Sequence, residues 1–281
     1  MSECQKWCCM IGLMTDRTRR VTAGCGCAGV IAVVLAIVLV VVLVGWVLSA
    51  LRPGAAVRSW QPVPDNVPPQ AGTPPPLIDV HGPGRTADLL ADWASPIAAE
   101  TYVDPQALRA YGNAELIARE AWPECNLVWN TLAGIGWVET RHGTYTGDAL
   151  TRGKLDPNGY ATPPIVGPAL DGSPGFARIE DTDGGHLDGD TEFDRAVGPM
   201  QFIPESFEKY GRDANGNGVP EPQQIDDAAL AAANLLCSGG RDLSVPEDWT
   251  QAILSYNNSN DYVVKVRDAA AAYAIPQPAV R

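Results

Sequence analysis

The sequence predicts a mostly helical domain of the α+β class that follows a single membrane-spanning segment. Helical hydrophobic spacing recurs from residue 86 onward, whereas the stretch 144–197 is rich in Gly, Pro and Asp. A stretch of that length without helices is unusual unless it is functional or pairs into small strands. We expect four parts: a cytoplasmic segment (1–23), a transmembrane helix (24–51), a Pro/Gly-rich linker (52–85) and the folded domain (86–281).

The transmembrane prediction rests on an apolar run near the N-terminus. No charged residue occurs from Val21 to Leu51, and this run exceeds the roughly 20 residues that cross a hydrocarbon core. A cleaved signal peptide ending near Gly54-Ala55-Ala56 is the alternative, but its apolar region should span only about 7 to 15 residues. Four basic residues precede the run: Lys6, Arg17, Arg19 and Arg20. They predict a single-pass protein of the plasma membrane, with its N-terminus in the cytoplasm and the domain outside.

The two sides of this span differ in charge. Residues 1–58 carry six Lys+Arg and two Asp+Glu, a net charge of +4, which leaves 14 and 31, a net charge of −17, for the remainder. Nucleic acids and anionic lipid surfaces are bound by basic proteins, so an acidic outer domain argues against both as ligands. A neutral or mixed-charge polymer fits better.

The cysteines divide in the same way. Five precede or begin the apolar run, where the cytosol keeps thiols reduced: Cys4, Cys8, Cys9, Cys25 and Cys27. Their spacing does not match a zinc site. Cys125 and Cys237 are the two cysteines on the outer side, where disulfides persist, so they are candidates for a disulfide.

Helix signals cover most of the domain, and one helix carries an acid on its apolar face. The expected helices span residues 86–99, 105–122, 126–141, 204–210, 227–237, 248–256 and 260–274. Glu139 lies four residues after Ile135 on the apolar stripe of the third helix, in its last turn. Burial and the negative end of the helix dipole should both raise the pKa of its carboxyl, which suits a proton donor. A Glu paired with an arginine at the helix end is the alternative.

Three short motifs, in this order and spacing, resemble a known enzyme family. They are Gly136-Trp-Val-Glu-Thr-Arg-His-Gly143, Gly198-Pro-Met-Gln201 and Ser255-Tyr-Asn257. Together they resemble the lytic murein transglycosylases of the lysozyme-like superfamily, most of all the membrane-bound B-type group and its relatives in high-GC Gram-positive bacteria. The resemblance covers nearly all of residues 100–275. Thr140 stands where many relatives have Ser, which keeps the hydroxyl.

The resemblance implies a lysozyme-like fold and assigns a role to each motif. Glu139 would be the sole catalytic acid, Gln201 and Met200 would line the cleft beside it, and Tyr256 and Asn257 would hold the acid and the sugar. Such enzymes cleave the bond between N-acetylmuramic acid and N-acetylglucosamine in peptidoglycan and leave a 1,6-anhydro sugar. The muramyl 6-hydroxyl replaces water, so neither a second carboxylate nor a cofactor is required for the chemistry, unlike the usual two-carboxylate glycosidase.

Five aspartates in the irregular stretch leave the reaction type open. They are Asp181, Asp183, Asp188, Asp190 and Asp194. They would supply a second carboxylate, bind a cation or, as we favour, cap Gly-rich turns. A second carboxylate would make the protein a hydrolytic muramidase, and a silent site would make it a non-catalytic peptidoglycan-binding scaffold. The expected partners are glycan strands, the membrane, and proteins of cell-wall synthesis or division.

A calcium loop is predicted after the second motif. Its ligands would be Asp213, Asn215, Asn217, the Val219 carbonyl and Asp227. The alternating oxygen ligands and the glycine at the sixth place match such loops. Gln224 stands where the usual loop has Glu, and Asp227 matches the longer loop of the B-type family. We therefore expect a structural Ca²⁺ bound at about 0.1 to 1 mM, with a plain Asx-rich turn as the alternative.

Overall fold

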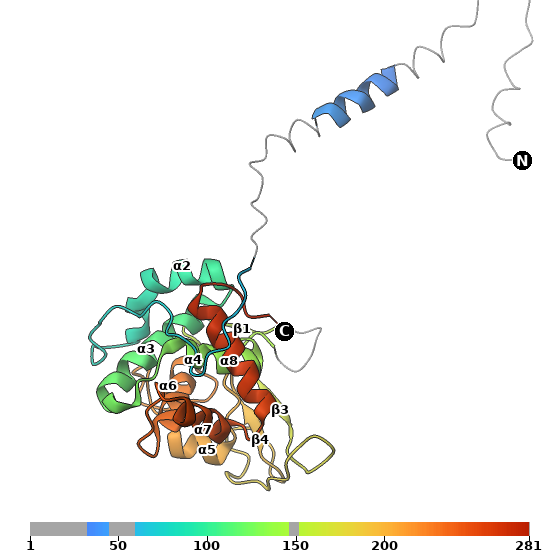
Figure 1. Cartoon of the computed structure of the whole chain (residues 1–281). Coiled ribbons are helices and arrows are strands. Elements are labelled where there is room, and N and C mark those ends of the chain that lie inside the picture. Colours follow the sequence, from blue (N-terminus) through green and yellow to red (C-terminus); the bar gives the residue numbers. More distant parts are fainter. Residues whose placement is uncertain (1–32, 45–59, 146–151, 281) are drawn as a thin grey trace, which may run out of the picture. The chain divides into compact units, whose positions relative to one another are not determined.

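The computed structural model describes residues 33–44, 60–145 and 152–280, and the chain divides into two units, 1–59 and 60–281 (Figure 1). In the first unit residues 33–44 form a helix with exposed side chains. Among the described residues, no helix is both long enough and apolar enough to span a membrane. The remainder of the predicted span, the cytoplasmic segment and the five N-terminal cysteines lie outside the described residues, so the anchor stays a prediction.

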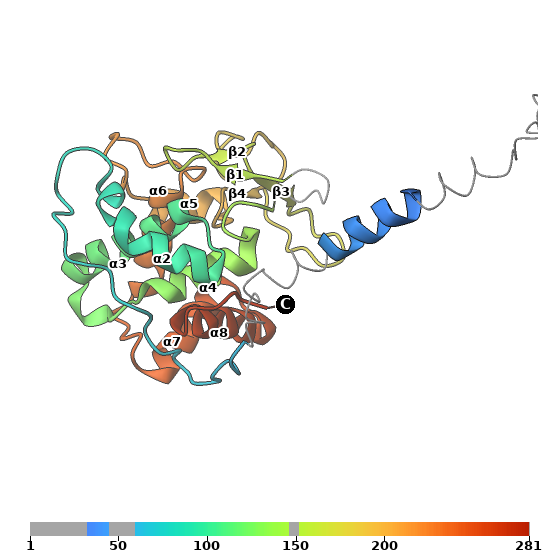
Figure 2. The ribbon, with the colours of Figure 1, turned by 90° about the horizontal axis from the view of Figure 1, so that it is seen from above.

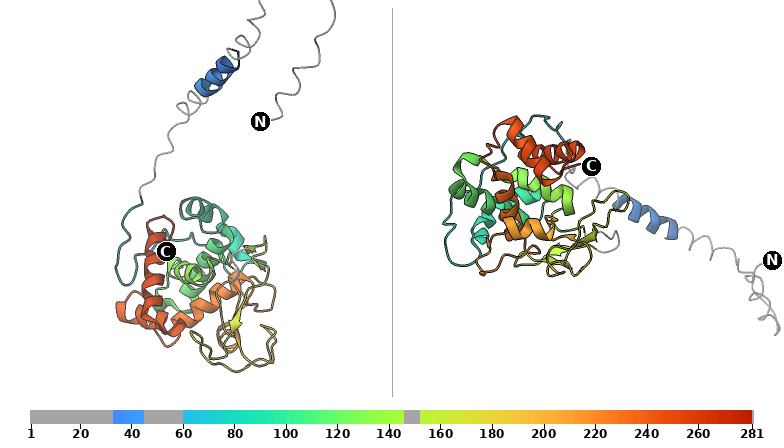
Figure 3. Two further views of the ribbon diagram at one scale, coloured as in Figure 1. Left: turned by 90° about the vertical axis from the view of Figure 1, so that its right-hand side faces the viewer. Right: turned by 90° about the horizontal axis from the view of Figure 1, so that it is seen from below.

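The second unit is mostly helical. Its elements are η2 (Thr86–Leu90), α2 (Ala91–Thr101), α3 (Pro105–Ala121), η3 (Pro123–Cys125), α4 (Trp129–Thr140), β1 (Lys154–Leu155), β2 (Ala161–Thr162), β3 (Val166–Ala169), β4 (Arg195–Val197), α5 (Pro204–Tyr210), α6 (Ile225–Cys237), α7 (Pro246–Tyr256) and α8 (Asn260–Ala274). Helix α4 packs against both α3 and α8, and α3 packs against α6. The small strands lie at one side of this unit and α8 at the opposite side (Figures 2 and 3).

Local signals set two of the helix starts. The Asp104 side chain accepts a hydrogen bond from Gln106 N at 2.8 Å, with Pro105 at the first position of α3, as the sequence predicts. At α6 the capping residue is Gln224, whose Oε1 accepts from the backbone N–H groups of Asp226 and Asp227. The place where a calcium loop usually has its Glu is therefore occupied by a helix cap.

The close packing of α4 on α8 depends on a small residue. Gly134 lies so near α8 that a Cβ there would come within 2.6 Å of the Val266 carbonyl oxygen. Around it, Leu132 and Ile135 are fully buried. The apolar stripe of α4 therefore lies in the core, and α4 packs closely against α8.

The irregular stretch contains the small strands that its length suggested. β1 pairs with β2 and β3 with β4, both antiparallel, with Lys154 opposite Thr162 and Val166 opposite Val197. These are separate two-stranded sheets, so the described lobe is mainly turns. The α+β, mostly helical class holds for the described residues.

The predicted linker differs from the structure. The compact unit begins at Trp60, and residues 60–85, which we call the strap, lie against it rather than forming a free tether (Figure 1). Near its start, the amide of Gln277 donates to the Gln61 carbonyl at 2.9 Å and accepts from Gln61 N at 3.0 Å. The domain therefore starts at residue 60 rather than at residue 86.

The middle of the strap is fixed to the first turn of α4. Asn130, fully buried, accepts from Gly72 N at 3.0 Å and donates to the carbonyls of Gln70 and Ala270 at 2.9 and 3.0 Å. One side chain thus joins the strap, α4 and α8. Proline and glycine content predicted a linker here, but composition could not show what the segment packs against.

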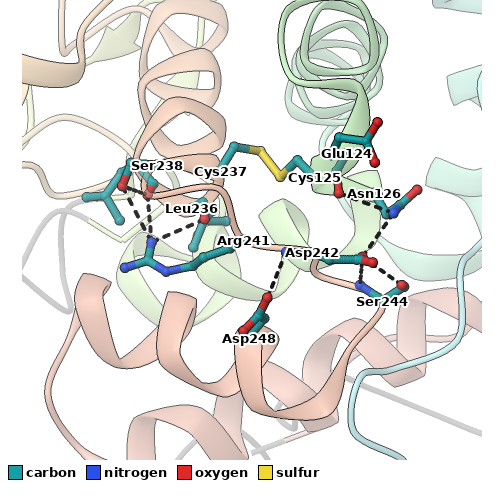
Figure 4. Close-up of a disulfide and its surroundings, with 11 residues drawn as sticks. Glu124, Cys125, Asn126, Leu236, Cys237, Ser238, Arg241, Asp242, Ser244 and Asp248 are labelled. Atoms are coloured by element: carbon teal, nitrogen blue, oxygen red, sulfur yellow. Dashed lines mark hydrogen bonds between the residues drawn. A yellow bond between two sulfur atoms is a disulfide. The ribbon is translucent and has the colours of Figure 1, made fainter.

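A disulfide joins η3, the short helix before α4, to the end of α6. Cys125 and Cys237, 112 residues apart in sequence, are bonded, as the compartment argument suggested (Figure 4). Asn126 next to the bridge donates to Asp242 at 2.9 Å, and Leu243 N donates to the Cys125 carbonyl at 2.8 Å. The bridge and these bonds tie the loop after α6 to the segment that precedes α4.

Candidate active site

The site is organised around Glu139, which lies in the last turn of α4 and is half-buried. Its Oε1 accepts a hydrogen bond from the Tyr262 hydroxyl of α8 at 2.5 Å. Burial raises the pKa of the Glu139 carboxyl to about 7, and the hydrogen bond from Tyr262 opposes this shift only in part. A carboxyl with this pKa is substantially protonated near neutral pH and can act as a general acid and, after ionisation, as a base.

Tyr262 is the hydrogen-bond partner of Glu139 that the motifs missed. They suggested that Tyr256 holds the acid, but the hydroxyl of Tyr256 donates to the Met200 carbonyl at 2.6 Å. The two tyrosine rings stack at 6.4 Å between centroids with 8° between their planes, so Tyr256 supports the residue that binds Glu139. The only sequence signal for Tyr262 was its place on the apolar stripe of α8.

The second motif is fixed to the end of α4 through Thr140. Its hydroxyl donates to the Pro199 carbonyl at 2.5 Å and accepts from Gly143 N at 2.8 Å. Gly198, at φ +76°, lies where a Cβ would meet the Pro222 carbonyl oxygen at 1.8 Å, so the turn requires glycine. The hydroxyl shared by Thr and Ser at position 140 therefore has a structural purpose.

The other residues of that motif do not bind Glu139 directly. The Gln201 amide nitrogen donates to the carbonyls of Gly198 at 3.0 Å and Ala196 at 3.3 Å, and its backbone is left-handed at φ +49°. Met200 is fully buried, so its side chain cannot line a cleft as expected. It contributes instead through the carbonyl that receives Tyr256. Asn257 is exposed at the end of α7.

A buried polar chain is centred on His142, just after the end of α4. His142 is bridged by two hydroxyls, that of Tyr111 at 3.1 Å from Nδ1 and that of Tyr273 at 2.9 Å from Nε2. Tyr111 also reaches the Met200 sulfur at 3.9 Å. Burial lowers the pKa of His142 to about 3, so the imidazole is neutral. Gly136 permits this arrangement, since a Cβ there would lie 2.1 Å from the Tyr111 hydroxyl.

A neutral imidazole has one donor and one acceptor, which gives the chain a direction. The hydroxyls of Tyr111 and Tyr273 therefore act in opposite senses, one donating to a ring nitrogen of His142 and the other accepting from its ring N–H. Every member is satisfied without a charge. The chain therefore links α3, α4, α8 and the second motif.

The lobe aspartates hold turns, as we favoured from the sequence. Asp194 is fully buried and accepts from the N–H and the hydroxyl of Thr182 at 2.9 and 2.8 Å. Asp188 accepts from Arg195 N at 2.6 Å, and Asp190 pairs with the Arg195 guanidinium at 2.8 Å. Hydrogen bonds from the backbone and from Arg195 lower the pKa of Asp190. These carboxylates are engaged within the lobe.

Carboxylate oxygens of Asp181, Asp183 and Asp194 lie within 4.8 Å of one another, which is compatible with a cation. Their described bonds go to lobe backbone groups and to Thr182. Such bonds stabilise turns whether or not an ion is present.

The calcium-like loop closes on one buried carboxylate. Asp227 Oδ1 accepts from the backbone N–H groups of Ala214 and Asn215 at 2.8 and 3.2 Å, and its Oδ2 accepts from Glu221 N at 2.9 Å. Burial raises the pKa of Asp227 to about 7, and the nearby negative charge of Asp213 adds to the shift. Two carboxylates that repel each other in a closed loop are the donor set that a divalent cation favours.

The remaining predicted ligands take part in the same loop. Asp213 accepts from the N–H groups of Gly216 and Gly218, while Asn215 and Asn217 accept from residues two positions on. All four predicted side chains therefore belong to one hydrogen-bonded loop. This geometry is shared by calcium loops and by plain Asx turns.

The comparisons with known proteins add one structural likeness. No family model matches the chain, and no curated protein matches it. A solved structure of the Escherichia coli lytic transglycosylase Slt35 in complex with bulgecin A is similar to it at 14% sequence identity and a TM-score of 0.35. The likeness covers 65% of this chain and 78% of that one.

Proposed function

We propose that the outer domain is a lytic transglycosylase that cleaves the MurNAc–GlcNAc bond of peptidoglycan. The observation that supports this most is the Glu139 carboxyl, with a pKa of about 7 and a tyrosine hydroxyl on one oxygen. The first motif contains this carboxyl, and Tyr256 of the third motif stacks on Tyr262, whose hydroxyl binds it.

One group supplies both proton transfers in this reaction. Glu139 donates its proton to the glycosidic oxygen as the C1–O bond breaks, and GlcNAc leaves as an alcohol. The C6 oxygen of the muramyl unit then bonds to C1, and its proton passes to the Glu139 carboxylate. The acid is regenerated, no water is consumed, and the product is a 1,6-anhydro sugar. Tyr262 stabilises the carboxylate between the two transfers.

The structure gives a reason to prefer this over the hydrolytic alternative. A muramidase needs a second group to hold a water, and the lobe aspartates are engaged with donors of the lobe itself. An internal nucleophile removes that requirement. A non-catalytic scaffold would gain nothing from a carboxyl whose pKa is raised at a cost in stability.

The decisive experiment is mass spectrometry of fragments released from purified cell wall by the full chain. We expect 1,6-anhydro ends, and reducing ends would contradict the proposal in favour of a muramidase. Glu139→Gln should lower the rate by about 10⁴ or more while glycan binding remains. Asp188→Asn is the matched control and should cost far less. The value of kcat/KM should fall as pH rises through about 7, because the acid must start protonated.

We also propose that this domain works outside the plasma membrane, tethered by one N-terminal helix. The uncharged run from Val21 to Leu51 and the preceding basic residues support this, and the Cys125–Cys237 disulfide suits an oxidising compartment. Protease added to intact cells without their wall should degrade the domain and spare the N-terminus. A protected domain would contradict it. Crosslinking in cells would then identify partners in wall synthesis or division.

A structural calcium ion is a second proposal, supported by the paired carboxylates of Asp213 and Asp227. Calcium binding requires Asp227 to ionise, so it should release a proton near neutrality and weaken as pH falls below about 7. Millimolar calcium should raise the melting temperature, and Asp213→Ala should abolish that response. Equal melting curves in calcium and in EDTA would leave an Asx-rich turn.

A further inference from the structure

A pocket lies between the lobe and helix α5. Its volume is about 560 Å³, within the roughly 300 to 1,000 Å³ of pockets that receive a small molecule. One wall comes from the lobe segment 182–187, another from α5 with Gly211 at its end, and Pro220 of the calcium-like loop adds a third. Glu139 and its partner Tyr262 do not line this pocket, so it is a site apart from the candidate active site.

The floor of the pocket is apolar. Pro204 and Phe207 of α5 are buried, and Phe207 belongs to the hydrophobic core of the domain. Leu187 is half-buried and packs against that core from the lobe side. The floor therefore favours a hydrocarbon group, because binding there removes apolar surface from water.

The rim of the pocket, formed by its more exposed residues, is negatively charged. It carries the carboxylates of Asp183 and Glu208 and the imidazole of His186. Neither the Glu208 carboxylate nor the His186 ring has a hydrogen-bond or ion-pair partner among the described residues. Asp183 accepts hydrogen bonds from the backbone N–H groups of residues 185–187, which do not neutralise its charge. The rim therefore favours a cation.

The protein itself does not supply that cation. No lysine or arginine lines the pocket in the described part of the chain. The two cationic residues that follow Glu208 in the sequence are engaged elsewhere. The Lys209 ammonium lies over the ring of Tyr210, 4.9 Å from its centroid. The Arg212 guanidinium donates to two backbone carbonyls at the end of α5.

The floor and the rim together select an alkylammonium group. Ion pairs between exposed groups are weak, so charge alone would not hold a cation here. A methylene chain adds apolar contact along the floor, and the ammonium at its end has three N–H donors for the acceptors of the rim. A lysine-like side chain therefore fits both parts of the pocket.

A row of aromatic rings joins the pocket to the candidate active site. The Phe207 ring lies 5.8 Å from that of Phe202, which lies 5.4 Å from that of Tyr256. The Tyr256 ring stacks at 6.4 Å on Tyr262, which binds Glu139. Even if it were straight, this row would be no longer than about five extended residues. The pocket thus lies within the reach of a short peptide attached to a sugar at the acid.

We infer that this pocket binds the free alkylammonium group of a diamino residue in the peptide stem of the muramyl unit, an inference that rests on the proposed function. Stems are crosslinked through the amine of such a residue, and a crosslink acylates that amine and removes its charge. The methylene chain packs on Phe207 and Leu187, and the ammonium pairs with Glu208 and Asp183. The enzyme therefore prefers strands whose stems keep a free amine.

The first experiment measures binding without cleavage. It titrates the full chain with a soluble stem peptide, which has no glycosidic bond, and with the same peptide acetylated on its amine. We expect acetylation to weaken binding by about fivefold or more. Glu208→Lys should weaken binding of the free-amine peptide by about tenfold, because charge reversal replaces attraction with repulsion, and should leave the acetylated peptide unaffected. Glu205→Lys, the same change on α5 outside this pocket, is the matched control and should alter neither.

The second experiment compares cleavage of glycan strands with free and with acetylated stem amines. Acetylation should raise KM for the wild-type chain several-fold with little change in kcat, and should have no effect on Glu208→Lys. Equal binding of the two peptides, or equal effects of Glu208→Lys and Glu205→Lys, would overturn the inference. Failure to cut either kind of strand, with peptide binding intact, would instead overturn the proposed function. A smaller difference between the two peptides at high salt would support the charge pairing.

Discussion

The helical half of the domain and the lobe at 152–203 satisfy their backbones in different ways. In α6, twelve of thirteen residues are buried, and the helix supplies its own hydrogen bonds. In the lobe, much of 171–192 is exposed. Aspartate carboxylates there accept hydrogen bonds from backbone N–H groups that would pair between strands in a sheet. The single carboxylate of Asp183, for example, accepts hydrogen bonds from three backbone N–H groups, those of residues 185, 186 and 187. The helical half is thus stabilised by close packing and burial of apolar surface, and the lobe by hydrogen bonds to charged carboxylates and by turn geometry.

The two regions also contribute differently to the site around Glu139. Glu139, Tyr262 and Tyr256 stand on helices that pack closely, so the acid and its hydrogen bond are fixed. The lobe contributes the turn with Gly198, which is bonded to α4 through Thr140 and to α7 through the Tyr256 hydroxyl on the Met200 carbonyl. Changes in the helical half should therefore alter stability and catalysis together. Changes in the lobe should alter local order first.

The largest stability effect should come from the bridge within the helical half. Replacing both Cys125 and Cys237 by Ala removes a crosslink that spans 112 residues. The loop-entropy model puts its contribution at about 4 to 5 kcal/mol of unfolding free energy, mainly through the unfolded chain. Urea unfolding with and without reductant measures it. A loss below about 1 kcal/mol would mean that helix packing alone holds α4 to α6.

The next effect tests whether the strap belongs to the helical half. Asn130→Ala removes three hydrogen bonds at a fully buried site and leaves the Gly72 N–H without its acceptor. We expect a loss of about 3 kcal/mol. Cleavage by protease between residues 60 and 85 should accelerate as well. Thr250→Ala, an exposed hydroxyl on α7, is the control for a polar-to-Ala change. A loss no larger than the control's would make the strap a mere surface segment.

The sequence predicted some of this half well, for physical reasons. Asp104 and Pro105 are local signals, and they placed the start of α3 correctly. The position of Glu139 on an apolar stripe predicted a raised pKa, because burial follows from helical spacing. The cysteine pair followed from compartment alone. Each of these three predictions depends on residues close in sequence or on the redox compartment, and not on contacts between distant elements.

The remainder depended on contacts between distant elements. Tyr262 reaches Glu139 only because Gly134 lets α8 approach α4, and nothing near residue 262 in sequence indicates that approach. The strap shows the same composition as a free linker. Its docking could have been suspected only from Asn130, an amide on an otherwise apolar helix face that needs partners when buried. The lobe had no periodic pattern, so its strands could be expected but not placed.

A third prediction uses the raised pKa of the Glu139 carboxyl in the helical half. The folded pKa of Glu139, about 7, exceeds the unfolded value of 4.5, so the folded state binds more protons between these pH values. Stability from this group is therefore full below about pH 4.5 and falls as pH rises to about 7. Glu139→Gln removes that loss and should stabilise the domain by about 2 to 3 kcal/mol above pH 7.

Melting curves of Glu139→Gln and wild type at several pH values measure this. The two curves should converge near pH 4.5 and separate toward pH 7, with the variant more stable. Asp227 also has a raised pKa, but it titrates in both proteins and cancels in the difference. A difference that does not change with pH would mean that the Glu139 pKa is not raised.

The smallest effect belongs to the lobe and sharpens the contrast. Asp183→Ala removes an acceptor from three backbone N–H groups, but Gly185 N keeps Asp181 as a second acceptor, and the other two lie near water, which replaces the lost carboxylate. The change also removes one of three carboxylates whose oxygens lie within 4.8 Å of one another, which relieves repulsion from Asp181 and Asp194. The two effects oppose each other, so the free energy of unfolding should fall by less than about 1 kcal/mol. Hydrogen exchange should instead quicken at residues 185–187 and stay unchanged in α4 and α6. Asp183→Asn keeps an acceptor oxygen and should preserve most of the protection. Faster exchange throughout α4 would show that the lobe and the helical half unfold as one unit. The two regions would then not be stabilised separately.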